Sequence, residues 1–304
     1  MSLSEPSGLL ILNKPSGMTS HDCVYKIRKL YSTKRVGHTG TLDPMATGVL
    51  VMLVGRAAKA AEYLSADTKG YTATLRLGIT TDTEDTTGKV LSECDRIPTH
   101  GEVIEAAKGF TGNIKQIPPM YSALKVGGKK LYDLAREGIV VEREARDITI
   151  HSLTVTPTED ASRYILNVEC SSGTYIRTLC ADIGSAIGVG GVMETLHRTR
   201  AGDFHISVSH TFAELDTMSE DERLSLLLPT EKLFDNLHAV YLPAFYEKLC
   251  RNGCEIYEKK IKAEFRLGER VRLYSESGEF FALGEVREFP DGNAIKAIKI
   301  FELC

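Results

Sequence analysis

The sequence predicts an α+β fold with a largely antiparallel sheet, followed by a small β-barrel near the C-terminus. Strand-like and helix-like segments are mixed without the regular alternation of a doubly wound fold. Residues 211–235 hold seven acids against two basic residues, which is typical of a helical connection or a domain edge. After about residue 240, short patterned segments are separated by Gly and Asp-Gly turns, which favours a barrel of about sixty residues.

The first elements are expected to be a strand, a turn and a helix. Residues 9–12 form a short apolar run that reads as a strand, and Lys14-Pro15-Ser16-Gly17 is a turn signal. Thr19 or Ser20 is expected to cap a helix whose apolar residues recur at helical spacing (Val24, Ile27 and Tyr31).

The remaining elements follow from periodicity and turn residues. Residues 48–55 suit a buried strand or a short core helix, and residues 71–78 alternate as a half-buried strand. Residues 99–111 are expected to be helical, strands are expected near 142–156 and 163–170, and residues 171–179 form a tight segment. The polar stretch TTDTEDTTGK (80–89) lacks the spacing of an EF-hand, so we expect a solvated turn.

Composition excludes several classes of protein. The chain has 304 residues, of which 42% are hydrophobic and 26% charged, which argues against disordered and fibrous proteins. The apolar runs are too short for a membrane span, and the first residues lack a basic region and an apolar core typical of a secretory signal. Seven scattered cysteines without a C-x-x-C pair indicate reduced thiols and predict no zinc site. We therefore expect a cytoplasmic protein.

The charge is unevenly distributed. The formal net charge is -4, yet residues 14–35 carry six basic residues against one acid, Asp22. Residues 248–272 carry eight basic residues against four acids. A net acidic protein can confine positive charge to one surface, so nucleic acid remains a possible partner.

The stretch RVGHTGTLDPMATGVL (35–50) places Asp43 among glycines and threonines, directly before Pro44. Glycines permit the close approach of a bulky ligand, and a proline restricts the residue before it. A carboxylate held in this way could act as a nucleophile or a general base. The alternative is an Asx turn without any chemistry, and the local pattern alone leaves both open.

Six segments resemble motifs of the TruB family of bacterial tRNA pseudouridine synthases, in the same order over residues 8–212. They are LLILNKPSGMTS, RVGHTGTLDPMATGVLVMLVGRAAK, KGYTATLRLGITTDTEDTTG, QIPPMYSALKVGGKKLYDLAREG, SSGTYIRTLCADIG and METLHRTRAGDF. The resemblance implies a pseudouridine synthase fold and the isomerisation of uridine 55 in the T loop of tRNA. This reaction requires no metal and no cofactor.

The resemblance also implies roles for particular residues. Asp43 matches the catalytic aspartate of the family. Tyr71 matches the tyrosine that stacks on the target base and assists proton transfer. Arg177 matches the arginine that pairs with the catalytic acid. Whether the acid attacks the sugar, attacks the base or abstracts a sugar proton stays open. Three further positions match the substrate-binding set: Leu196 as an apolar wall of the uracil pocket, His38 as a residue that intrudes into the RNA, and Lys14 on the phosphate path.

The resemblance and the patterning together divide the chain into a catalytic domain (residues 1–235) and a PUA-like RNA-binding barrel (residues 236–304). The implied partner is tRNA, contacted at its T loop and acceptor arm, with no membrane and no obligatory protein partner. Two rivals remain: an RNA-binding protein without chemistry, and a related synthase that modifies another RNA with guide RNA and protein partners. The presence of Asp43, Tyr71 and Arg177 argues against the first.

Overall fold

The computed structural model describes residues 5–63, 68–122 and 124–301. Among these residues, nine strands form one large sheet, with the main order β1-β3-β12-β4-β11-β10-β7. Strands β3 and β12 are parallel, and the other pairs are antiparallel, which confirms the mixed, largely antiparallel sheet. The strands are β1 (Gly8–Lys14), β2 (Val36–His38), β3 (Thr47–Val54), β4 (Lys69–Leu77), β7 (Gly112–Gln116), β10 (Arg146–Pro157), β11 (Arg163–Cys170), β12 (Gly191–Ala201) and β13 (Phe204–His205).

Strand β3 carries two cores because successive side chains point to opposite faces of the sheet. Leu50, Met52 and Val54 pack with α1 (Ser20–Leu30) and α5 (Phe212–Thr217). Val49 and Val51 face the other way, towards η1 (Gly55–Tyr63). The apolar run at 48–55 is therefore a buried strand.

Helix α1 begins where the sequence predicts. Thr19 is the N-cap residue, and its side chain accepts a hydrogen bond from the backbone N–H of Asp22 at 3.0 Å. The carboxylate of Asp22 accepts the N–H of Thr19 in return, which completes a capping box. The apolar face at Val24 and Ile27 is buried against the sheet.

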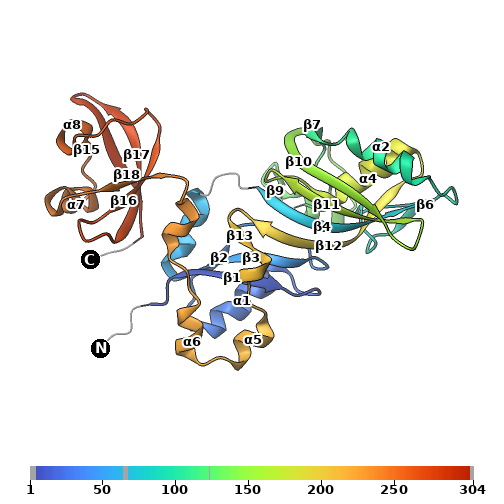
Figure 1. The fold of residues 1–304 in the computed structure, drawn as a ribbon, viewed down its shortest axis with the longest axis horizontal. Coiled ribbons are helices and arrows are strands. Elements are labelled where there is room, and N and C mark those ends of the chain that lie inside the picture. Colours follow the sequence, from blue (N-terminus) through green and yellow to red (C-terminus); the bar gives the residue numbers. More distant parts are fainter. Residues whose placement is uncertain (1–4, 64–67, 123, 302–304) are drawn as a thin grey trace.

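Two helices cover the other half of the sheet, as Figure 1 shows on the side of β10 and β11. Helix α2 (His100–Lys108) confirms the helix predicted near residues 99–111. Helix α4 (Ile176–Ile187) was not predicted, because the sequence analysis took residues 171–179 only as a tight segment. Its buried face, which includes Leu179, Cys180 and Ile183, joins the core formed by β4, β11 and β12.

Several short helices and strands lie outside the large sheet. The hairpin β5 (Ile79–Thr81) and β6 (Val90–Glu93) flanks the polar stretch at 82–89. The segment after β7 contains β8 (Lys125–Val126), β9 (Lys129–Lys130) and α3 (Leu131–Arg136), with a small core of its own. The acidic segment at 211–235 contains α5, α6 (Glu220–Ser225) and η3 (Thr230–Phe234), so the predicted helical connection is confirmed.

The C-terminal strands form a half-barrel, whereas the sequence predicted a small β-barrel. Among residues 236–301 the pairing runs in the order β14-β16-β17-β18-β15 and does not join the two outer strands. Strand β15 has only two residues and pairs with β18 at one edge of this sheet. The elements are β14 (His238–Tyr241), α7 (Ala244–Arg251), β15 (Ile256–Tyr257), α8 (Glu258–Ile261), β16 (Arg270–Tyr274), β17 (Phe280–Phe289) and β18 (Gly292–Ile300).

The half-barrel lies at one end of an elongated molecule and meets the larger part through an apolar contact (Figure 1). Phe234 in the connection packs against Phe280 and Phe301 of the half-barrel, and Ala60 of η1 joins this cluster. Within the described ranges no helix is both long and apolar enough to cross a membrane.

Candidate active site

The loop between β2 and β3 carries Asp43, and the N-terminal segment holds this loop from one side. The ammonium of Lys14 donates to the carbonyl oxygens of Ala46 (2.6 Å), Pro44 (3.1 Å) and Pro15 (2.9 Å). The backbone N–H of Gly17 donates to the same Pro44 oxygen at 2.8 Å. These bonds fix the chain immediately after Asp43.

Lys14 is therefore not where the sequence analysis expected it. Its side chain is fully buried, and its three hydrogen bonds to carbonyls use the donors that a phosphate would need. Burial lowers the pKa of Lys14, although the negative charge of Asp43 opposes this shift. The structure thus replaces the expected place on a phosphate path with a role in holding the Asp43 loop.

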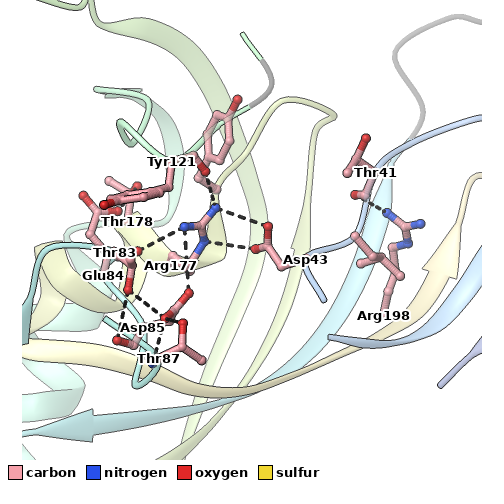
Figure 2. Close-up of polar contacts among 12 residues, drawn as sticks. Thr41, Asp43, Thr83, Glu84, Asp85, Thr87, Tyr121, Arg177, Thr178 and Arg198 are labelled. Carbon is pink, nitrogen blue, oxygen red and sulfur yellow. Dashed lines mark hydrogen bonds and ion pairs between the residues drawn. The ribbon is translucent and has the colours of Figure 1, made fainter. Parts of the chain in front are cut away.

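Arg198 holds the same loop from the side of the sheet. Its guanidinium is buried and donates to the carbonyl oxygens of Val49 (2.6 Å) and Gly40 (3.2 Å). A longer contact, at 3.5 Å, reaches the carbonyl oxygen of Thr41 (Figure 2). Gly48 permits this approach: its φ is +101°, and a Cβ there would lie 2.2 Å from the carbonyl oxygen of Arg198.

Arg177 stands at the beginning of α4 and binds Asp43 with two nitrogens. Its Nε lies 3.0 Å from Oδ2 of Asp43, and an Nη2 hydrogen bond reaches Oδ1 at 3.3 Å. The remaining donors bind the backbone carbonyls of Thr83 (3.0 Å) and Tyr121 (2.8 Å). Figure 2 shows the guanidinium surrounded by these groups, so its orientation is fixed by three separate chain segments.

The polar stretch at 80–89 is not a solvated turn, and this prediction was wrong for its central acid. Asp85 is buried, and its Oδ1 accepts bonds from Thr83 Oγ1 (2.7 Å) and from the N–H and Oγ1 of Thr87 (2.9 and 2.6 Å). Its Oδ2 lies 3.9 Å from Nη1 of Arg177. Burial of this acid is possible because local threonines and the arginine compensate its charge.

The environment of Asp43 sets competing effects on its protonation. Burial raises the pKa of Asp43 above its ordinary value, and the charge of Asp85 adds to the rise, whereas the charge and hydrogen bond of Arg177 lower it. The side chain nevertheless remains 34% exposed. The result is a carboxylate that is oriented by protein groups but open to a ligand, as a nucleophile or general base requires.

Tyr71 and Leu196 lie beside this loop in the central strands. Tyr71 in β4 is directly opposite Arg198 in β12, and Leu196 is opposite Ala73. Both side chains are 8% exposed and belong to the same core cluster as Leu42. Burial raises the pKa of Tyr71, while the charge and hydrogen bond of Arg198 oppose the rise. The structure therefore brings Tyr71, Leu196 and Arg177 into the surroundings of Asp43.

His38 ends β2 at the start of the same loop. Its Nδ1 is buried and, within the part of the chain that the structure describes, has no hydrogen-bond partner. Burial lowers the pKa of His38, which favours the neutral imidazole. Across the described residues, no group of three or more His, Cys, Asp and Glu is arranged to hold a metal ion.

The sequence analysis missed Asp85 and Arg198. A signal for Arg198 was present, because it is two residues from Leu196 in a strand and so shares its face. Asp85 gave no such signal: its neighbours in the sequence are polar, and Arg177, which helps to compensate its buried charge, is distant in the sequence.

Comparison with known proteins gives consistent matches. Residues 28–176 match the model of the TruB family pseudouridylate synthase N-terminal domain, and residues 177–235 match that of the tRNA pseudouridylate synthase B C-terminal domain. The chain is 42% identical over 299 residues to the tRNA pseudouridine synthase B of Alkaliphilus oremlandii, covering 98% of each protein. It is 43% identical to the protein of that name from Bacillus licheniformis, covering 91% of this chain and 92% of the relative.

Solved structures share the fold over nearly the whole chain. A chain of a Cbf5-Nop10-Gar1 complex superposes with a TM-score of 0.74 and 27% identity, covering 97% of this chain and 85% of that chain. A chain of an H/ACA RNP bound to a substrate RNA containing 2'-deoxyuridine gives a TM-score of 0.72 with 25% identity, over 97% and 85% of the two chains.

Proposed function

Because the chain belongs to the TruB family of tRNA pseudouridine synthases, we propose that it converts uridine 55 in the T loop of tRNA to pseudouridine. Asp43 is the residue that we propose acts on a flipped-out uridine. The observation that carries this proposal is the two-nitrogen contact of Arg177 with an Asp43 side chain that stays 34% exposed.

The proposed reaction breaks the bond between N1 of uracil and C1′ of ribose and joins C1′ to C5. A proton leaves C5 and N1 gains one, so no electrons are exchanged with another reagent. An ionised Asp43 can attack C1′, attack the base, or remove a sugar proton, and all three routes need its negative charge. Arg177 favours this ionised form against the effect of burial.

The neighbouring side chains suit a uracil that must turn during the reaction. We assign Tyr71 as the aromatic face for the base, since stacking tolerates different base orientations, and Leu196 as an apolar wall. His38 would fill the space that the extruded nucleotide leaves, because base extrusion costs a few kcal/mol that a replacing side chain offsets. The neutral state of His38 is compatible with insertion beside bases.

We assign residues 236–304, whose described part forms the half-barrel, to a PUA-like RNA-binding domain that contacts the acceptor arm of tRNA. Exposed basic residues on and after α8 support this assignment (Lys259, Lys260, Lys262 and Arg266). Phosphate neutralisation by such residues supplies sequence-independent affinity. A tRNA substrate would place the activity in the cytoplasm.

We further propose that the chain acts on tRNA without a guide RNA or a protein partner. The test is to incubate the purified protein alone with an unmodified tRNA transcript and to map pseudouridine at single-nucleotide resolution. Pseudouridine at position 55, and none in a transcript with cytidine at that position, supports the proposal. No product, or product only at other uridines, would contradict it.

A further inference from the structure

Glu84 has an unusual backbone conformation for a residue with a side chain. Its φ is +63°, in the left-handed region that L-residues other than Gly, Asn and Asp rarely adopt. Such conformations persist where the surrounding structure determines them, and they cluster at functional sites. Here the surroundings are the backbone of β12 on one side and the side chain of Thr178 on the other.

Hydrogen bonds from two elements hold this conformation. The carbonyl of Glu84 accepts the N–H of Met193 in β12 at 3.0 Å, and the N–H of Thr86 donates to the carbonyl of Met193 at 3.1 Å. On the side of α4, Thr178 Oγ1 donates to Oε2 of Glu84 at 2.6 Å (Figure 2). Hydrogen bonds to ionised carboxylates are among the stronger ones in proteins.

The position of this bond connects it to Arg177. Glu84 lies between Thr83, whose carbonyl accepts a hydrogen bond from Arg177 at 3.0 Å, and Asp85, whose carboxylate lies 3.9 Å from the guanidinium. Thr178 directly follows Arg177 in α4. If the distance between Glu84 and Thr178 changes, the carbonyl of Thr83 and the carboxylate of Asp85 therefore move relative to α4, which carries Arg177.

Packing alone does not fix the side chain of Glu84. A cavity of about 290 Å³ adjoins it, lined also by Thr80, Thr81 and, from α4, Ala181 and Ser185. Without the hydroxyl of Thr178, the carboxylate has room to turn into this space. The hydrogen bond is then the contact that holds the side chain of Glu84 to α4, in addition to the contacts of Arg177 with Thr83 and Asp85.

We propose that Glu84 and Thr178 form a positioning pair, which holds the loop of residues 82–85 against α4 and so fixes the guanidinium of Arg177 in front of Asp43. The pair does not touch the substrate. The inference rests on the proposed function, because it concerns the orientation of the arginine that binds the proposed catalytic carboxylate.

The test compares two substitutions of Thr178 in the full-length protein. Thr178→Val keeps the shape but removes the hydroxyl, and Thr178→Ser keeps the hydroxyl. We expect the valine variant to lose about tenfold in kcat with KM for tRNA within about twofold, since small misplacements near reacting groups reduce turnover strongly. The serine variant should stay within about twofold of the wild-type kcat. Ser185→Ala, another α4 hydroxyl at the same cavity, is the control and should leave kcat unchanged.

Two further variants keep the test decisive if Thr178→Val folds poorly. Glu84→Gly accepts a positive φ but lacks the carboxylate, so it should lose kcat as the valine variant does, whereas Glu84→Gln keeps an acceptor and should lose less. Wild-type kcat in the valine or glycine variant, or equal losses with valine and serine, would overturn the inference. Wild-type protein and Asp43→Asn in the same assay separate the two proposals. No pseudouridine from the wild type would contradict the proposed function, and normal turnover by Asp43→Asn would contradict the proposed role of Asp43, whatever the Thr178 variants show.

Discussion

The guanidinium of Arg177 holds the carboxylate of Asp43 through two nitrogens, with Nε 3.0 Å from Oδ2 and Nη2 3.3 Å from Oδ1. The arginine is almost completely buried, while the aspartate keeps a third of its side chain exposed. Arg177 thus presents the acid to the outside while its own position is fixed from within by backbone carbonyls of Thr83 and Tyr121.

Arg177→Lys should lower kcat about a hundredfold and change the dissociation constant for tRNA by only a few-fold. Lysine keeps the positive charge but cannot bind the carboxylate with two planar nitrogens, and misplacement of a reacting group of about 1 Å costs this much. Arg163→Lys is a matched control, because Arg163 also binds a carboxylate, that of Glu194, with two nitrogens at 2.7 and 3.0 Å. If both variants keep full kcat, the two-nitrogen contact has no part in catalysis.

As the pH is lowered, kcat/KM should begin to fall at a pH above the ordinary pKa of an aspartate. Burial raises the pKa of Asp43, with a further contribution from Asp85, so protonation removes the reactive carboxylate at a higher pH than in a free aspartate. Asp85→Asn removes one of the causes of the rise and should move the acid limb of kcat/KM to lower pH. The local hydrogen bonds should survive this substitution, because the three donors from Thr83 and Thr87 all bind Oδ1 of Asp85, and asparagine also has an Oδ1.

The control for this pH profile is Asp82→Asn, an exposed acid of the same loop. It should leave the acid limb in place. A limb that moves to higher pH in Asp85→Asn would show that the charge of Asp85 does not act on Asp43 as the geometry indicates.

Arg198→Lys should lower both the stability of the protein and the rate of the proposed reaction. The substitution removes donors from the carbonyls of Val49 in β3 and Gly40 in the Asp43 loop, and each unsatisfied buried group costs about 1–3 kcal/mol. We expect the free energy of unfolding in urea to fall by about 2 kcal/mol. Arg200→Lys, on the same strand but in a partly exposed pair with Glu169, should cost less than about 1 kcal/mol. Equal losses would mean that Arg198 is an ordinary strand residue.

Affinity for tRNA should fall steeply with salt, and part of this dependence should come from the half-barrel. Replacing Lys260 and Lys262 with glutamine removes two exposed charges and should lower the log-log salt slope by about one to two units. The single-turnover rate at saturating tRNA should not change. Replacing Lys89 and Lys108, exposed lysines of the larger part, is the control of equal charge. An unchanged slope in the first variant would argue against an RNA-binding half-barrel.

Local signals were sufficient for much of the fold. Capping chemistry predicted the N-cap at Thr19 or Ser20, and the patterning of residues 163–170 predicted the strand there. The continuous apolar run at 48–55 left a buried strand and a short core helix open, and the structure shows the strand. Helix α4 was missed because its first residues follow a turn and carry no capping side chain: its N-cap residue, Tyr175, makes no side-chain cap hydrogen bond. Packing on β12, a long-range contact, stabilises this helix instead.

For the candidate site, too, some residues were predicted from the sequence and others were not. Asp43, Tyr71 and Arg177 were found through motifs, and the structure brings them together. Lys14 and Asp85 were misjudged because charged residues are ordinarily exposed. Here, three carbonyls surround the lysine, and two threonines and an arginine surround the acid. Each environment includes partners far apart in the sequence, Pro44 and Ala46 for Lys14 and Arg177 for Asp85, and local patterns do not reveal these partners.

The most direct test of the account is a single-turnover assay of Asp43→Asn with tRNA labelled with tritium at C5 of uridine, together with filter binding of the same RNA. Asparagine keeps the shape and the turn-forming capacity of aspartate but lacks its charge and basicity. We predict that the variant folds, binds tRNA within a few-fold of the wild type, and releases no measurable tritium. Near-normal release of tritium would contradict the account, because Asp43 would then be a residue of the turn and not of the chemistry.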